Sequence, residues 1–321
     1  MYWIIAALIL LLATVLIVFI CYAYRVAFYM PPVTRRHDNL YDLPRGAQYE
    51  KERDRMRDLI AAMEPVCYEE VYLTAKDGVR LFARYYHSAD GAPLQIQFHG
   101  YRGAALRDFC GGNKLARDAG HNTLVVDQRA HGKSEGRAIA FGVKEREDCL
   151  LWARYARERF GDVPIFLSGV SMGAATVLMA SELPLPENVV GIIADCPYSS
   201  PEAIIRKVCR HMHMPPRLVF PFIRFSARLF ARFDVTSCSA VTAVRNTKLP
   251  ILLLHGEDDR FVPVDMSREI YDAAAGEKNL YTFPGAGHGL SYLVDTESYK
   301  KAVDDFIRAC ITRSCEKKRG S

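Results

Sequence analysis

Short apolar runs alternate with longer amphipathic segments over most of the chain. Uninterrupted apolar runs of this length are typical of strands that are buried on both faces of a parallel sheet. They lie at 94–100, 122–128, 164–170, 189–195, 250–256 and 279–285. Segments with a helical pattern, such as 144–160 and 172–183, separate them. The alternation predicts an α/β fold with a mostly parallel, doubly wound sheet, preceded by a hairpin over residues 68–86.

The N-terminus has a different pattern. Residues 4–23 form an uncharged apolar run that is long enough for one bilayer crossing, with Trp3, Tyr22 and Tyr24 where interfacial aromatic residues are expected. A buried core helix and a cleaved signal peptide are the alternatives. No Lys or Arg precedes the run, and Ile20 before Cys21 does not suit a lipoprotein cleavage site. We therefore expect a transmembrane anchor over residues 1–24.

Charges beside this run predict its orientation. Arg25, Arg35 and Arg36 follow the run, and the α-amino group is the charge that precedes it. By the positive-inside rule, the chain is a single-pass membrane protein with the remainder in the cytoplasm. Its nine cysteines are scattered without a CxxC pair, which agrees with reduced thiols in that compartment.

Residues 25–66 have the composition of a linker. They contain Pro31-Pro32 and a charged run over 49–64, which predicts an exposed or membrane-apposed helix that ends before Pro65. The main unit is expected over residues 67–315, interrupted by an insertion at about 199–245 that breaks the alternation of strands and helices.

The overall composition narrows the possible partners and cofactors. Half of the 321 residues are apolar and a quarter are charged, as in an ordinary globular protein. The formal net charge of +5 is too small to indicate a nucleic-acid partner. His211 and His213 could both face a metal, but no third ligand lies nearby in the sequence. We expect neither a metal nor a cofactor.

Two pentapeptides, 132–136 and 169–173, have the Gly-x-Ser-x-Gly pattern of serine hydrolases. The pattern produces a reactive serine at a sharp turn between a strand and a helix. Ser171 follows an apolar run and opens a helical segment, whereas Ser134 has neither neighbour. A phosphate-loop interpretation of Gly132-Lys133-Ser134 also fails, because Asp127 occupies the first required glycine position. We predict Ser171 as the nucleophile and residues 131–136 as a loop that could line the site.

A serine hydroxyl needs a base and an acid that orients the base. His288 lies in a glycine-rich loop after the last apolar run, where it is free to point an imidazole at the site, whereas His255 is expected to brace its own turn. Asp259 is the favoured acid, because it emerges at the end of run 250–256. Asp258 emerges beside it, and the remaining alternatives are Asp195 and Glu257.

These segments resemble the α/β-hydrolase superfamily over residues 68–312, especially its membrane-anchored bacterial members of unassigned substrate. The matching pieces are GVSMG, HGEDDRFVP, GAGHG, HGYRG and DQRAHGKSEG. The resemblance implies an α/β-hydrolase fold with a helical cap. The family pattern Gly-x-x-Asp-x-x-Val-Pro places the acid at Asp259. It also implies an oxyanion hole made by the backbone N–H groups of Met172 and Tyr101, with Gly100 as the less favoured alternative to Tyr101.

The insertion at 199–245 is both basic and apolar, as expected of such a cap. Arg224, Arg228 and Arg232 are spaced to share one helical face, opposite an apolar face formed by Phe222, Phe225, Leu229 and Phe233. This amphipathic pattern predicts either contact with an anionic membrane surface or packing of the phenylalanines onto the pocket. With either arrangement we expect an apolar, aromatic pocket roof that favours hydrophobic acyl groups.

The sequence therefore predicts a membrane-anchored serine hydrolase that cleaves carboxylic esters with acyl or lipid-like groups through an acyl-enzyme intermediate. Its expected partners are a small-molecule acyl ester and, through the N-terminal helix, membrane lipid. A peptidase or thioesterase with the same triad is an alternative, because the triad alone does not fix the substrate. A non-catalytic binding protein of the same fold is the second alternative.

Overall fold

An eight-stranded sheet forms the centre of the molecule in the computed structural model, which describes residues 1–31 and 43–319. The strand order is β1-β2-β4-β3-β5-β6-β7-β8, and the pairs from β4 to β8 are parallel, whereas β2 runs antiparallel to both β1 and β4. The strands are β1 Glu69–Thr74, β2 Arg80–Tyr86, β3 Leu94–Phe98, β4 Asn122–Asp127, β5 Ile165–Val170, β6 Val189–Asp195, β7 Ile251–Gly256 and β8 Lys278–Phe283. The predicted doubly wound, mostly parallel sheet is confirmed.

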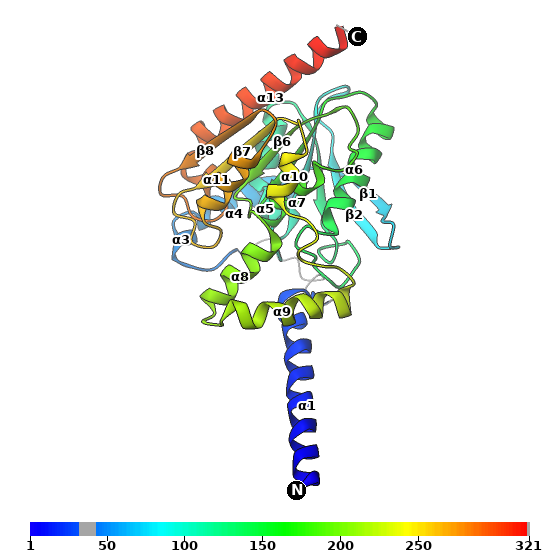
Figure 1. Cartoon of the computed structure of the whole chain (residues 1–321). Coiled ribbons are helices and arrows are strands. Elements are labelled where there is room, and N and C mark those ends of the chain that lie inside the picture. The colour runs from blue at the N-terminus through cyan, green and yellow to red at the C-terminus, as the bar shows by residue number, and fades with distance from the viewer. Residues whose placement is uncertain (32–42, 320–321) are drawn as a thin grey trace.

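Helices cover both faces of this sheet (Figure 1). One layer contains α4 Arg53–Met63, α5 Ala105–Asp118, α12 Ser291–Val294 and α13 Thr296–Arg319. The other contains α6 Glu145–Phe160, α7 Met172–Ala180, α10 Ala240–Arg245 and α11 Val264–Ala273. Strands β3 to β7 are rich in apolar residues because both of their faces are covered by helices, and every residue of β3 and β7 is buried.

Helix α1 Tyr2–Ala27 extends away from this body (Figure 1). It is long and apolar enough to cross a membrane, and few of its residues are buried in the molecule. Ile20 and Ala23, near its C-terminal end, are the buried ones. Of the charges used to predict the orientation, Arg25 is exposed on α1, whereas Arg35 and Arg36 lie outside the described residues.

The charged run over residues 49–64 forms a helix that ends before Pro65, as predicted, but one side of this helix is buried and not exposed. It contributes to α3 Ala47–Glu50 and to α4, which packs against α5. Met56, Ile60 and Met63 are buried there in one cluster. Their spacing at i, i+4 and i+7 places them on one side of the helix, so a narrow apolar stripe docks a helix that is otherwise charged.

The insertion forms α8 Pro201–His211, α9 Pro216–Ser226 and the π-helical turn η1 Ala227–Ala231. Helix α9 lies across the C-terminal part of α1 (Figure 1). The predicted three-arginine face is wrong. Arg224 and Arg228 both pair with Asp234, whereas Arg232 ends the helix in a left-handed conformation with φ of 54°. Phe233 is likewise not on an exposed apolar face, because it is buried against Phe28.

Candidate active site

Ser171 sits on a strained turn between β5 and α7. Its φ of 54° and ψ of −113° are rarely adopted by a residue with a side chain. The two motif glycines allow the turn. A Cβ at Gly169 would lie 2.3 Å from the backbone of Gly173, and a Cβ at Gly173 would lie 1.8 Å from the carbonyl oxygen of Phe98. The chain can therefore bend sharply enough to project the serine beyond the end of the sheet.

His288 lies between Ser171 and Asp259. Its Nε2 is 3.0 Å from Ser171 Oγ, and its Nδ1 is 2.6 Å from Asp259 Oδ2. The three residues follow strands β5, β7 and β8, whose carboxyl ends lie along one edge of the sheet. The sheet thus brings together residues that are far apart in the sequence, as the sequence analysis expected for strand-end positions.

Both oxygens of the Asp259 carboxylate accept hydrogen bonds, and the group is ionised. Its Oδ1 accepts hydrogen bonds from the backbone N–H groups of Phe261 and Val262, both at 2.8 Å. Burial opposes ionisation, but hydrogen bonds from His255 and His288 outweigh it and hold the pKa of Asp259 well below its usual range. The carboxylate can therefore keep the imidazole of His288 oriented and stabilise its charged form.

The structure separates Asp259 from the other acids considered. Asp258 and Glu257 are exposed, and Glu257 accepts a hydrogen bond from Thr282. Asp195 is buried at the end of β6, where Ser291 Oγ lies 3.4 Å from its carboxyl group. Burial raises the pKa of Asp195 to about 6. Of these acids, Asp259 is the one that is hydrogen-bonded to His288.

The residues that we did not place in the triad have structural contacts. His255 Nδ1 bonds Ser267 Oγ at 2.7 Å, and its Nε2 bonds the carbonyl of Val262 at 2.8 Å, so it braces the turn that carries Asp259. Ser134 is buried, accepts a hydrogen bond from the N–H of Phe82 at 2.8 Å and donates to the carbonyl of Asp127. Neither side chain is hydrogen-bonded to Ser171 within the described residues.

The loop after β3 lies beside Ser171, where a Cβ on Gly100 would be 3.5 Å from the Cβ of Ser171. The backbone N–H of Gly100 donates to Asp108 Oδ2 at 2.9 Å, so this donor is already used. Tyr101 is the next residue of the loop and lines the same pocket as Ser171. Met172 follows the serine directly at the first position of α7. Tyr101 and Met172 thus remain the predicted oxyanion-hole donors.

Two buried histidines, neither of which was predicted to have this role, brace this loop. His99 Nδ1 donates to the carbonyl of Gly100 at 2.8 Å. His131 Nε2 accepts from the N–H of Arg102 at 3.1 Å, which requires the neutral imidazole. Burial, and then the neighbouring His99, lower the pKa of His131 to about 3. His131 therefore supports the candidate oxyanion loop through Arg102, whereas residues 131–136, contrary to our prediction, do not line the pocket.

The same loop also contacts the end of α1. Tyr101 donates its hydroxyl hydrogen to the carbonyl of Ala27 at 2.9 Å. Arg102 donates to the carbonyls of Val26 at 2.9 Å and of Tyr29 at 3.2 Å. These carbonyls lie at or just beyond the C-terminal end of α1, where no further helical turn supplies N–H donors to them. The N-terminal helix and the candidate oxyanion loop are therefore directly connected.

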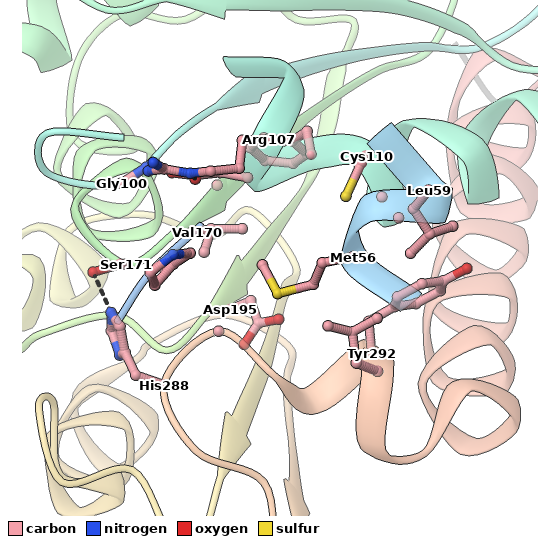
Figure 2. Close-up of a pocket in the computed structure, with 18 of the residues that line it drawn as sticks. Met56, Leu59, Gly100, Arg107, Cys110, Val170, Ser171, Asp195, His288 and Tyr292 are labelled. Atoms are coloured by element: carbon pink, nitrogen blue, oxygen red, sulfur yellow. Dashed lines mark hydrogen bonds and ion pairs between the residues drawn. The ribbon is translucent and has the colours of Figure 1, made fainter. Parts of the chain in front are cut away.

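A pocket of about 560 Å³ opens beside Ser171 and His288. It continues past Val170 toward α4, α5 and α12, as Figure 2 shows. Its deeper wall is largely apolar and includes Met56, Leu59, Cys110 and Leu293. Asp195 and Tyr292 add polar atoms to this wall, and the volume lies in the usual range for small-molecule sites.

The pocket is not roofed by the insertion, contrary to our prediction. Among the described residues that line it, none comes from 199–245. The segment before α4 lines the pocket instead, through Leu43, Gln48 and Tyr49. The backbone N–H of His288 also lies 3.4 Å from Gln48 Oε1, so the segment before α4 contacts the histidine loop directly. Phe222 and Phe230 of the insertion contact α1 instead, and Phe225 is exposed.

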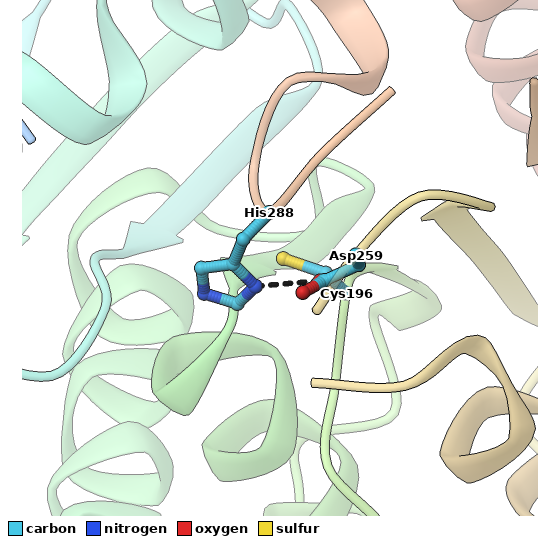
Figure 3. A group of neighbouring side chains, drawn as sticks. All are labelled: Cys196, Asp259 and His288. Carbon is cyan, nitrogen blue, oxygen red and sulfur yellow. Dashed lines mark hydrogen bonds and ion pairs between the residues drawn. The ribbon is translucent and has the colours of Figure 1, made fainter. Parts of the chain in front are cut away.

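Cys196, Asp259 and His288 place potential metal-binding atoms within 4.8 Å of one another (Figure 3). The chemistry of this set does not favour a metal. Burial raises the pKa of the Cys196 thiol well above its ordinary value, so the thiolate that a metal requires is disfavoured. The carboxylate and imidazole are already joined by the hydrogen bond of 2.6 Å.

Comparison with known proteins agrees with the fold. A family model described as the alpha/beta hydrolase fold matches residues 96–234, and a second, described as serine aminopeptidase S33, matches residues 223–295. The chain has the α/β-hydrolase fold. The hydrolase is also similar in structure to the esterase Pf2001 of Pyrococcus furiosus, with a TM-score of 0.60 and 22% identity over 79% of this chain and 92% of that one. Est1E of Butyrivibrio proteoclasticus gives a TM-score of 0.60 and 22% identity over 75% and 99% of the two chains.

Sequence relatives include both bacterial and animal proteins. The hydrolase is 26% identical to the uncharacterized protein YqkD of Bacillus subtilis over 60% of this chain and 64% of that protein. It is 25% identical to the lysophosphatidylserine lipase ABHD12 of Danio rerio over 61% of this chain and 53% of that protein. The matches thus span about half to two thirds of the length of these relatives.

Proposed function

We propose that this hydrolase is a membrane-anchored serine esterase that cleaves carboxylic esters with an acyl or lipid-like group. The observation that carries the proposal is the continuous hydrogen-bonded series from Ser171 through His288 to Asp259, with contacts of 3.0 and 2.6 Å. A nucleophile, a base within reach of it and an acid that orients the base are the three requirements of acyl transfer by serine.

The proposed reaction has two halves. His288 Nε2 takes the proton of Ser171 as Oγ attacks the ester carbonyl. The oxyanion is stabilised by the N–H groups of Tyr101 and Met172, each worth roughly 3 kcal/mol of barrier. His288 then protonates the leaving alcohol, and an acyl group remains on Ser171. Water, deprotonated by His288, releases the acid.

An acyl chain is the substrate part that best fits the pocket. Its deep wall contains Met56, Leu59 and Val170, and apolar groups gain about 25 cal/mol for each Å² removed from water. The name of the animal relative, a lysophosphatidylserine lipase, supports a lipid-like ester. Helix α1 supports anchoring in a membrane, and Arg25 supports a cytoplasmic catalytic unit.

A fluorophosphonate probe tests the catalytic class. The folded wild type should be labelled, and Ser171→Ala should lose all labelling. Ser134→Ala is the matched control, because Ser134 lies in the second Gly-x-Ser-x-Gly segment and should remain labelled. A folded wild type that resists the probe would instead favour a non-catalytic binding protein.

The reaction type needs a second measurement. We expect p-nitrophenyl esters of graded chain length to be hydrolysed faster than acyl thioesters or aminoacyl p-nitroanilides. The peptidase alternative is favoured by the serine aminopeptidase model that matches residues 223–295. Faster cleavage of the anilides than of every ester, in a protein labelled at Ser171, would establish that alternative.

A further inference from the structure

The arm formed by α8, α9 and η1 exposes large apolar side chains. Leu218 is 68% exposed, Leu229 54% and Phe225 50%. Met212 and Phe230 are also exposed. Scattered apolar residues are normal on a protein surface, but a group of them on one short arm indicates that the arm contacts an apolar partner.

The exposed face of α9 is directed toward the projecting part of α1. Leu218, Phe222 and Phe225 are spaced at i, i+4 and i+7, so they share one face of the helix. Phe222, in the middle of this face, packs edge-to-face on Phe19 of α1 at 5.6 Å. Helix α1 extends away from the body on the side where α9 lies (Figure 1). The face of α9 that carries Phe222 is therefore directed toward α1 and the space around it.

A second aromatic contact fixes the end of the arm against the same helix. Tyr24 of α1 and Phe230 of η1 have ring centroids 5.1 Å apart. Phe28, just beyond α1, packs edge-to-face on Phe233 at 5.4 Å. Helix α9 and η1 are therefore attached to the C-terminal part of α1.

The position of the arm along α1 matches the thickness of a bilayer. From Tyr2 to Phe19 the helix rises about 26 Å at 1.5 Å per residue, close to the roughly 30 Å of the hydrocarbon core. A membrane crossed by α1 would consequently end where α9 lies against it. At that depth an amphipathic helix lies in the plane of the membrane and buries its apolar face among the upper acyl groups.

The positive charges near α9 are suited to binding phospholipid headgroups. Arg25 on α1 and Arg217 at the start of α9 are exposed, as is Arg232 at the end of η1. Arg224 and Arg228 are instead paired with Asp234, which holds the last turns of the arm together. Guanidinium groups bind phosphate oxygens through two parallel hydrogen bonds, so the three exposed arginines can engage the headgroups beside the buried apolar face.

We infer that α9 and η1 form an interfacial helix that inserts Leu218, Phe225 and Leu229 into the phospholipid bilayer around α1. The body of the hydrolase then has a fixed orientation to the membrane instead of swinging on a flexible tether. This inference rests on the proposed anchoring by α1, and the experiment below separates the two.

Depth-dependent fluorescence in nanodiscs tests the inference with the full chain. The background replaces the exposed Cys21, Cys67 and Cys315 with Ser, because the buried thiols of the folded protein are protected from labelling. An NBD label is placed through Phe225→Cys or Leu229→Cys. Phosphatidylcholine carrying a doxyl group near the headgroup quenches labels that enter the upper acyl region.

Two further positions serve as references. Tyr281→Cys, on β8, is the matched control for water, because Tyr281 is 43% exposed on the body. Leu11→Cys reports on the anchor itself, because Leu11 is 59% exposed in the middle of α1. Its label should be quenched by lipid with the doxyl group deep in the acyl chain.

The inference expects blue-shifted emission and loss of most fluorescence to the shallow doxyl lipid at positions 225 and 229, with neither effect at position 281. Water-like, unquenched labels at 225 and 229 beside a quenched label at 11 would overturn the interfacial helix but leave the anchor intact. An unquenched label at 11 would overturn both. A blue shift without doxyl quenching that requires two proteins in each disc would overturn the inference in favour of a second copy of this chain on the arm.

Discussion

Replacing Asp259 with asparagine tests the proposed mechanism at one atom. Asparagine has the same shape, but one of its terminal atoms is a donor. The backbone N–H groups of Phe261 and Val262 both point at Oδ1 at 2.8 Å, so the amide oxygen must occupy that site. The amide nitrogen is then forced into the Oδ2 site, 2.6 Å from His288 Nδ1.

This arrangement selects the wrong tautomer of His288. The amide N–H donates to Nδ1, so the ring proton moves to Nε2, the atom that must accept the proton of Ser171. Triads that lose the acid in this manner lose about 10⁴-fold in kcat, or roughly 5.5 kcal/mol of transition-state stabilisation at 1.36 kcal/mol for each factor of ten. The fold should be retained, because both backbone donors keep their acceptor.

Steady-state hydrolysis of a p-nitrophenyl ester measures the effect. Asp258→Asn is the matched control, since Asp258 is the adjacent exposed acid, and its kcat should stay within about twofold of wild type. Thermal unfolding of both variants checks that they are folded. Retention of more than about a tenth of wild-type kcat by a folded Asp259→Asn protein would refute the assignment of the acid and the tautomer argument together.

Three further predictions concern the supports of the site. Gly173→Ala should lower the free energy of unfolding by about 3 kcal/mol or more in urea titrations, because its Cβ would lie 1.8 Å from a backbone oxygen. The control Gly112→Ala should lower the free energy of unfolding far less, because its Cβ would meet a side chain at 3.1 Å. Arg102→Ala should reduce kcat about tenfold, with less effect on KM, because the loop that holds Tyr101 loses two hydrogen bonds to carbonyls at the end of α1. An unchanged kcat would show that the loop keeps its position without these two hydrogen bonds. The pKa of His131 is about 3 in the folded state and about 6.5 in the unfolded state, so the unfolded state binds the proton first as the pH falls. The stability that the neutral His131 contributes is therefore complete above about pH 6.5 and is lost from there toward pH 3. His131→Gln should accordingly lose less unfolding free energy than wild type between about pH 7.5 and about pH 5, and equal losses would contradict the neutral histidine.

The sequence identified the sheet and the positions at its edge. Six short apolar-rich runs became β3 to β8. Strands β3 to β7 are covered on both faces, so almost all of their residues are buried, whereas β8 lies at the edge of the sheet and has one buried residue. The choice of Ser171 over Ser134 depended on the same local logic of strand, turn and helix. The domain limits of 1–24, 25–66 and 67–315 stay predictions, as do the catalytic roles of Ser171, Asp259 and His288.

Contacts between distant segments were not predictable in this way. The apolar stripe of α4 consists of three residues in a charged run, so its burial depends on the neighbouring α5 and not on its own composition. His131 belongs to a motif that looks catalytic, yet its role is set by the N–H of Arg102, a partner 29 positions away. Neither partner leaves a local signal in the sequence.

The sequence by itself determined the strands, the sharp turn at Ser171 and the apolar N-terminal helix, because each depends on side-chain periodicity or on backbone sterics within a few residues. The tertiary structure alone decided what surrounds them. It made residues 43–59 the wall of the pocket, placed α9 against α1 and joined the end of α1 to the loop of Tyr101. These outcomes depend on which surfaces meet once the sheet has formed, and burial by a distant partner is a property of the pair and not of either segment.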